Sequence, residues 1–196
     1  MQTKATSARD YVSENDFLPL IEAYFELNNL KQLYRQGWLQ QGIDPERCES
    51  VAEHSFAVAI LALFLSQNLT RKIDLKKVLI MALIHDFGEI YAGDFTPSDS
   101  ISSDEKYGLE YSSVVKVFSK LPLGSQLLSY WQEYESRQSL EAQLVHQLDC
   151  LELVLQACIY EYQEAIDLSH FFQGVEGKIS LGSLQTIFQK IKEIRP

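Results

Sequence analysis

Apolar residues recur at helical spacing along most of the chain, and this periodicity constrains the fold more than any other feature. Residues 17–34 and 75–87 each carry apolar residues three or four positions apart, as amphipathic helices do. Further helices are expected at about 103–120, 124–135, 139–165 and 181–194. No segment alternates apolar and polar residues as a half-buried strand would. The sequence therefore predicts an all-α fold, a compact bundle of six or more helices around one core.

The segment that starts at about residue 51 combines a helix start signal with a strongly apolar run. Ser50 and Glu53 have the spacing of a capping box, and the run FAVAILALFL covers residues 56–65. Ten residues are too few to cross a bilayer, which requires about 20. We therefore expect a central helix that is apolar on every side, and no membrane span.

Length and charge limit the domain count and the partners. The chain has 196 residues, 46% of them apolar, which suits one domain over residues 1–196 with a loose N-terminus at about 1–15. Lys and Arg number 17 against 27 Asp and Glu, a net charge of −10 that repels a nucleic-acid backbone. A nucleic-acid polymer is thus excluded as a partner. A small phosphorylated substrate is not, because a metal ion and one or two basic groups can reverse the local field.

The cysteines and the N-terminus indicate a cytoplasmic protein. The three cysteines are odd in number and show no CxxC spacing, as is typical of core thiols in a reducing compartment. The N-terminal residues lack the charged and then apolar pattern of a secretory signal.

One carboxylate stands out because of its surroundings. Asp149 lies in LVHQLDCLELVLQACIY, residues 144–160, with apolar neighbours on both sides. Burying an ionised carboxylate alone costs several kcal/mol, so it needs a hydrogen-bonded partner, a cation or a metal. Lys and Arg are sparse in this helix, so a divalent metal is the simplest cationic partner for the Asp149 carboxylate. Four side chains from three helices can converge on one ion: His54, His85, Asp86 and Asp149.

This ligand set indicates the class of metal. Imidazoles mixed with carboxylates suit one divalent ion such as Mn²⁺, Co²⁺, Fe²⁺, Zn²⁺ or Mg²⁺, with open positions for water and substrate, whereas structural zinc sites usually carry thiolates. His85 and Asp86 point about 100° apart on an ideal helix. We expect the last helical turn to depart from α geometry so that both reach one centre.

Several ordered blocks resemble a known family. They are RQGW (35–38), ESVAEHS (49–55), ALIHDFGEIYAGDFTPSD (82–99), DEK (104–106), WQEYE (131–135) and QLDCLELVLQACIYE (147–161). The pattern of His54, His85-Asp86 and Asp149 is similar to the H…HD…D signature of the HD-domain metal-dependent phosphohydrolases. In particular, the blocks resemble the branch of bacterial 5′-deoxynucleotidases and HD domain-containing protein 2, over about residues 30–165.

The resemblance implies a single all-helical HD domain built around a mononuclear metal site, and a homodimer. It implies hydrolysis of nucleoside 5′-monophosphates, typically the deoxy forms. The family's acidic residues after the HD pair correspond to Glu89 and Asp94, and its substrate contacts before the first histidine correspond to Arg35 and Trp38. His146 is a departure, since relatives often carry lysine there.

Roles for these residues follow from their chemistry. Glu89 can orient or deprotonate a metal-bound water, and Asp94 can protonate or position the departing 5′-oxygen; which is acid and which is base is open. Arg35 offers a planar fork for phosphate, and Trp38 or another aromatic can stack on a base.

Structural interpretations remain beside the functional ones. Glu89 and Asp94 can line a solvated loop mouth, Arg35 can cap a helix C-terminus, and Trp38 can be a core residue. His146 and Cys150 suit packing in the core, or contact with a metal ligand, better than metal ligation itself. The alternative functions are those of an HD-type phosphodiesterase or triphosphohydrolase, or of a non-catalytic nucleotide-sensing module.

Overall fold

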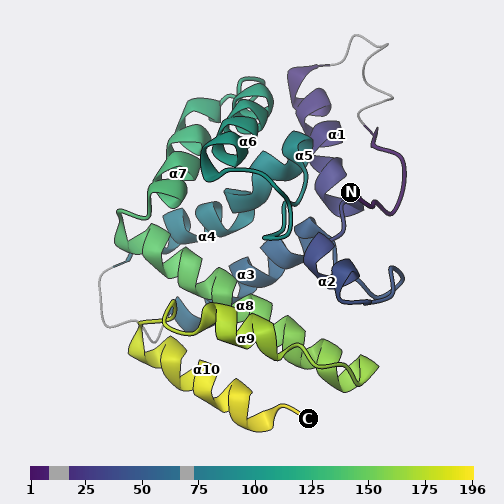
Figure 1. Ribbon diagram of the computed structural model, residues 1–196. Helices are drawn as coiled ribbons and strands as arrows, with labels where there is room; N and C mark the ends of the chain where they lie inside the picture. Colours follow the sequence, from purple (N-terminus) through teal and green to yellow (C-terminus); the bar gives the residue numbers. More distant parts are fainter. Residues whose placement is uncertain (9–17, 67–72) are drawn as a thin grey trace. The chain divides into compact units, whose positions relative to one another are not determined.

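The computed structural model describes residues 1–8, 18–66 and 73–196. Within these ranges the regular elements are helices, and β-type pairing is limited to the isolated bridges Thr3–Leu33 and Tyr34–Ser50 (Figure 1). The predicted all-α class is therefore confirmed. Among the described helices, none combines the length and the apolar character needed to cross a membrane.

The helices follow one another along the chain as labelled in Figure 1, with η3 a short 3-10 helix between α4 and α5. Their bounds are α1 Pro19–Gln32, α2 Gln36–Gln40, α3 Val51–Leu65, α4 Leu75–Ile84, η3 His85–Gly88, α5 Glu89–Ala92, α6 Ser103–Phe118, α7 Gly124–Ser136, α8 Leu140–Glu164, α9 Ser169–Val175 and α10 Gly182–Ile194.

Local start signals fix the helices that lead to the histidines. The capping box is present before α3: the Ser50 amide donates to Glu53 Oε2 (2.6 Å), and the Glu53 amide donates to Ser50 Oγ (3.3 Å). Asp74 caps α4 by accepting from the Lys77 amide (3.1 Å). These contacts satisfy amides that the first turn of a helix leaves without an intrahelical acceptor.

The chain forms two compact units, the first of which comprises Met1–Ser55 and Ile84–Gln132. In this unit α6 packs on η3 and α5, and α1 packs on α5 and α6. The side-chain amide of Asn29 donates to the Ile90 carbonyl (2.8 Å). Ser113 Oγ accepts from the Tyr91 amide (3.2 Å) and donates to the Phe87 carbonyl (3.3 Å). Residues 87–91 are therefore held by side chains from both α1 and α6.

The second unit comprises Phe56–Leu83 and Glu133–Pro196, and in it α9 and α10 pack on α8 (Figure 1). Gln147 Oε1 on α8 accepts from the amides of Ser180 and Leu181, both at 2.8 Å. Arg195, just after α10, donates to both carboxylate oxygens of Glu161. These polar contacts fasten the C-terminal segment to α8.

Two expectations need correction. Helix α3 is apolar on every side as expected, but it is not central: Phe56 is 62% exposed and Phe64 is 67% exposed, and its buried face is formed by residues such as Val58 and Ala62. The predicted loose N-terminus, 1–15, does not include Gln2 to Lys4, since the Lys4 amide donates to the Gln32 carbonyl (2.7 Å). Residues 9–15 lie outside the described residues. The expectation of one domain over residues 1–196 stays a prediction.

Candidate metal centre

The His85-Asp86 pair lies where α4 ends and the backbone changes to a 3-10 turn. The turn η3 spans His85–Gly88, so the expected departure from α geometry occurs at the pair itself. His85 Nε2 lies 3.2 Å from Asp86 Oδ2. The backbone is anchored by Trp131, whose buried indole N–H donates to the His85 carbonyl (3.0 Å). Sequence reasoning missed this role of Trp131, although the WQEYE block containing it was noticed.

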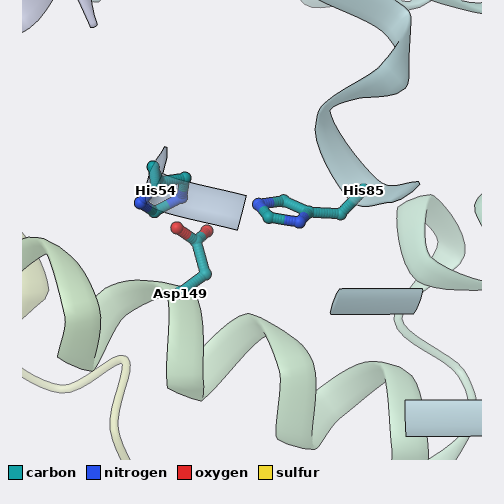
Figure 2. A group of neighbouring side chains, drawn as sticks. All are labelled: His54, His85 and Asp149. Carbon is teal, nitrogen blue, oxygen red and sulfur yellow. The ribbon is translucent and has the colours of Figure 1, made fainter. Parts of the chain in front are cut away.

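His54 approaches the same carboxylate from the first turn of α3. Its side chain is 1% exposed, and its Nε2 lies 3.7 Å from Asp86 Oδ2. The His54 and His85 rings meet edge to face, with centroids 5.4 Å apart. Figure 2 labels both imidazoles, together with Asp149 of the second unit. The first unit therefore brings two imidazole nitrogens to one carboxylate oxygen.

Asp86 is held in its ionised form by the charges around it. Burial opposes ionisation, but the charge of His85, followed by the charges of Arg35 and His54, outweighs burial and holds the Asp86 pKa well below its usual value. The Arg35 contribution comes from Nη1, 4.0 Å from Asp86 Oδ2. Oδ2 is buried, and within the described parts of the chain no hydrogen-bond donor reaches it.

A divalent cation fits this arrangement. A buried carboxylate oxygen without a hydrogen bond is costly, and a bound cation would offset that cost. Two imidazoles and a carboxylate are ligands that Mn²⁺, Fe²⁺, Co²⁺ and Zn²⁺ accept in proteins. His54, His85 and Asp86 can therefore hold a metal ion from within the first unit.

Glu89, the first residue of α5, is a buried carboxyl group rather than part of a solvated loop mouth. The residue is 4% exposed, and its buried Oε2 has no hydrogen-bond partner among the described residues. Burial, followed by the negative charges of Asp86 and Asp94, raises the pKa of Glu89 well above its ordinary value. A carboxyl group with a raised pKa beside a candidate metal ligand is suited to proton transfer near neutral pH.

Asp94 is a buried carboxylate that pairs with the half-buried Arg35. Asp94 is 5% exposed; its Oδ1 accepts from Arg35 Nη1 (3.0 Å), and its Oδ2 accepts from the Gln36 amide at the start of α2 (2.6 Å). Arg35 directly precedes α2, three positions after α1 ends at Gln32. Gln36 was not anticipated, because a backbone donor leaves no signal in the residue type.

Trp38 is a core residue, one of the two interpretations that the sequence left open. It is 1% exposed, and its indole N–H donates to Glu49 Oε1 (2.7 Å). A ring buried to this extent offers no free face to a nucleobase, so in this structure Trp38 supports the segment that carries Arg35.

Asp149 belongs to the second unit, on α8 between the fully buried Leu148 and Leu151. Its Oδ2 accepts from the Tyr134 hydroxyl (3.5 Å). The Tyr134 ring stacks on His146 with centroids 4.3 Å apart, and Arg137 Nε donates to His146 Nε2 (2.8 Å). His146 is thus a stacking and hydrogen-bonding residue, in line with the packing role expected for it. Tyr134 and Arg137 were not identified from the sequence.

Comparison with known proteins agrees with this chemistry. An HD domain family model matches residues 27–191. The chain is similar to 5′-deoxynucleotidase HDDC2 of Dictyostelium discoideum, at 36% identity over 81% of this chain and 88% of that relative, and to 5′-deoxynucleotidase HDDC2 of Homo sapiens, at 32% identity over 79% and 75%. Its fold resembles the crystal structure of PH0347 protein from Pyrococcus horikoshii OT3, with a TM-score of 0.74 and 32% identity over 88% of this chain and 98% of that one. The chain belongs to the HD domain family.

Proposed function

We propose that this protein is a metal-dependent phosphomonoester hydrolase that removes the 5′-phosphate from (deoxy)ribonucleoside 5′-monophosphates. The observation that carries the proposal is the buried, hydrogen-bond-free Oδ2 of Asp86 beside the Nε2 atoms of His54 and His85. Relatives that are similar over most of the chain are named 5′-deoxynucleotidases, which supports the substrate class.

One divalent ion is proposed as the cofactor, held by His54, His85, Asp86 and Asp149. The two aspartates would neutralise its 2+ charge, and the spacing of all four residues fits the family signature. When bound, such an ion polarises a phosphoryl oxygen and lowers the pKa of its water ligand. Mn²⁺, Co²⁺, Fe²⁺, Zn²⁺ and Mg²⁺ all remain candidates for this donor set.

Glu89 is proposed as the proton carrier of the reaction. Its Oε2 makes no hydrogen bond within the described residues, so this oxygen is available to accept a proton from the attacking water. The proton then passes from Glu89 to the departing 5′-oxygen, so that water and the monophosphate become a nucleoside and inorganic phosphate. The raised pKa makes Glu89 a stronger base for the first half of this transfer, and the departing 5′-oxygen is basic enough to take the proton in the second half.

Asp94 is proposed to position Arg35 rather than to act as the acid. Both Asp94 oxygens accept hydrogen bonds, one from Arg35 and one from the Gln36 amide, so Asp94 holds the segment that carries Arg35. Arg35, held in this way, would present its guanidinium group to the phosphate. We assign no base-stacking role to Trp38, because the ring is buried.

A phosphate-release assay over nucleoside mono-, di- and triphosphates with several metals tests the proposal. Release of inorganic phosphate from monophosphates alone is expected, whereas pyrophosphate or diester products would point to another HD-type reaction. Tight nucleotide binding without turnover with any metal would indicate a sensing module instead. Asp86→Asn and Asp149→Asn should lose both the metal, measured by elemental analysis, and activity. Asp104→Asn, at an exposed position in the first turn of α6, is the matched control.

We also propose a cytoplasmic homodimer. The three cysteines Cys48, Cys150 and Cys158 are free thiols, as suits a reducing compartment. Exposed apolar side chains on α3, including Phe56 and Phe64, offer a surface that a second copy could cover. A monomer in equilibrium sedimentation would contradict the dimer.

A further inference from the structure

Helix α6 approaches the His85–Gly88 turn more closely than a side chain at residue 88 would permit. A Cβ atom placed on Gly88 would lie 2.6 Å from the Glu110 Cβ and 2.8 Å from its Cγ. The φ of Gly88 is −54°, which any residue adopts, so glycine is needed here for space. Glu110 is consequently seated on the backbone between Asp86 and Glu89.

Glu110 holds a lysine beside these two carboxylates. Lys106 Nζ lies 3.4 Å from Glu110 Oε1, one turn away on α6. The Lys106 side chain is 39% exposed, whereas the Glu110 side chain is 11% exposed. The Lys106 ammonium therefore has Glu110 as an ion-pair partner, at a distance longer than a strong hydrogen bond, and part of its side chain is open to solvent.

Lys106 interacts electrostatically with carboxylates of the candidate metal centre. Burial lowers the pKa of Lys106, but the carboxylates of Glu110, Glu89 and Asp86 outweigh burial and raise it above the usual value. The ammonium is thus charged at neutral pH. Its interaction with Glu89 and Asp86 agrees with the seating of Glu110 against Gly88.

The carboxylates of the site outnumber its basic side chains, so a further cation would help to bind an anionic substrate. Asp86, Glu89 and Asp94 can contribute three negative charges, and Arg35 Nη1 is already 3.0 Å from Asp94 and 4.0 Å from Asp86. A phosphomonoester dianion would bring two further negative charges. Arg35 and a metal ion alone would leave this anion close to unshielded carboxylates, which repel it.

We propose that Lys106 is a phosphate-binding residue, whose ammonium moves from Glu110 to the phosphoryl oxygens of the bound 5′-monophosphate. The inference rests on the proposed function for the identity of the substrate. Lysine suits this task because a compact point charge on a flexible stem can follow the phosphoryl group. Glu110 then holds the ammonium before substrate arrives and competes with the phosphate for it.

Binding of inorganic phosphate to the Mn²⁺-loaded protein, measured by calorimetry, tests this role without requiring turnover. Lys106→Met should weaken phosphate binding about 10- to 100-fold, as expected for a lost hydrogen bond to a charged group, and Lys106→Arg should recover part of it. Metal content should not change. Lys190→Met, which removes an exposed lysine paired with Glu193 three residues away on α10, is the charge-matched control and should bind phosphate like the wild type.

Glu110→Gln provides an opposite and independent change. Removing the competing carboxylate should tighten phosphate binding several-fold, and this result decides the matter even if Lys106→Met fails to fold. Unchanged phosphate binding in folded Lys106→Met, unchanged or weaker binding in Glu110→Gln, or no phosphate binding by the wild type would each overturn the inference. If the wild type binds phosphate through Lys106 but hydrolyses no nucleotide, the proposed function fails and the phosphate site stands.

Discussion

Replacing Glu89 by glutamine should stabilise the metal-free protein while it removes most of the activity. Glu89 is 4% exposed and its Oε2 has no hydrogen-bond partner among the described residues, so its charge is poorly solvated in the folded state. Leaving a buried polar group unsatisfied costs about 1–3 kcal/mol, and more for a charged one. One kcal/mol shifts the Tm of a chain of this size by about 2–4 °C. We expect the Tm of Glu89→Gln in chelator to lie about 2–12 °C above wild type at neutral or higher pH.

The direction of the pH dependence follows from the raised pKa of Glu89. Burial, with Asp86 and Asp94, makes the folded state bind this proton more tightly than the unfolded state. Stability from this group is therefore present below the unfolded-state pKa and is lost as pH rises through the folded-state pKa. The Tm advantage of Glu89→Gln should be near zero at about pH 4.5 and should grow as pH rises.

Differential scanning calorimetry of both proteins in chelator, once at about pH 4.5 and once at neutral or higher pH, measures the effect. Glu46→Gln, at an exposed position in the same unit, should show no comparable gain and serves as the control. The turnover number of the metal-loaded variant should fall about 10²- to 10⁴-fold, the usual contribution of a general base. A variant that is less stable than wild type at high pH, or a Tm difference that does not change with pH, would refute the reasoning.

Three further changes test the supports of the site. Gly88→Ala should lower the free energy of unfolding by about 1–3 kcal/mol in chemical denaturation, because the new methyl group would lie 2.6 Å from the Glu110 Cβ; wild-type stability would contradict this close approach. Trp131→Phe leaves the buried His85 carbonyl without its donor, so we expect a loss of about 1–3 kcal/mol and weaker metal binding in a Co²⁺ titration; unchanged metal affinity would show that the anchor is dispensable. Adding Mn²⁺ to chelator-treated protein at about 100 times its dissociation constant should stabilise it by about 2.7 kcal/mol in a thermal melt, an effect that should disappear in His54→Ala.

The sequence predicted the long helices but not the short ones. The periodic segments, together with the capping box of Ser50 and Glu53, predicted the helices that begin at Val51 and Leu75, because both signals are local. The short helices α2, α5 and α9 were not predicted, since 5, 4 and 7 residues give no more than two turns in which a period can be read.

The candidate site divides in a similar way. The His85-Asp86 pair and His54 were recognised by their residue types and spacing, which reflect the chemistry of metal binding. The surroundings of these residues were not recognised. Trp131 reaches the His85 carbonyl from 46 positions away, and Arg35 meets Asp94 across 59.

The sequence by itself determined the all-α class, the net charge of −10, and the set of side chains able to bind a metal. These depend on residue type and on hydrogen bonds within a few positions, which any single stretch of chain carries. Only the tertiary structure decided that Trp38 is buried, that Asp94 clamps Arg35, and that Lys106 stands beside the site's carboxylates. Contacts of this kind arise when helices pack, and packing selects among many arrangements that leave each helix unchanged.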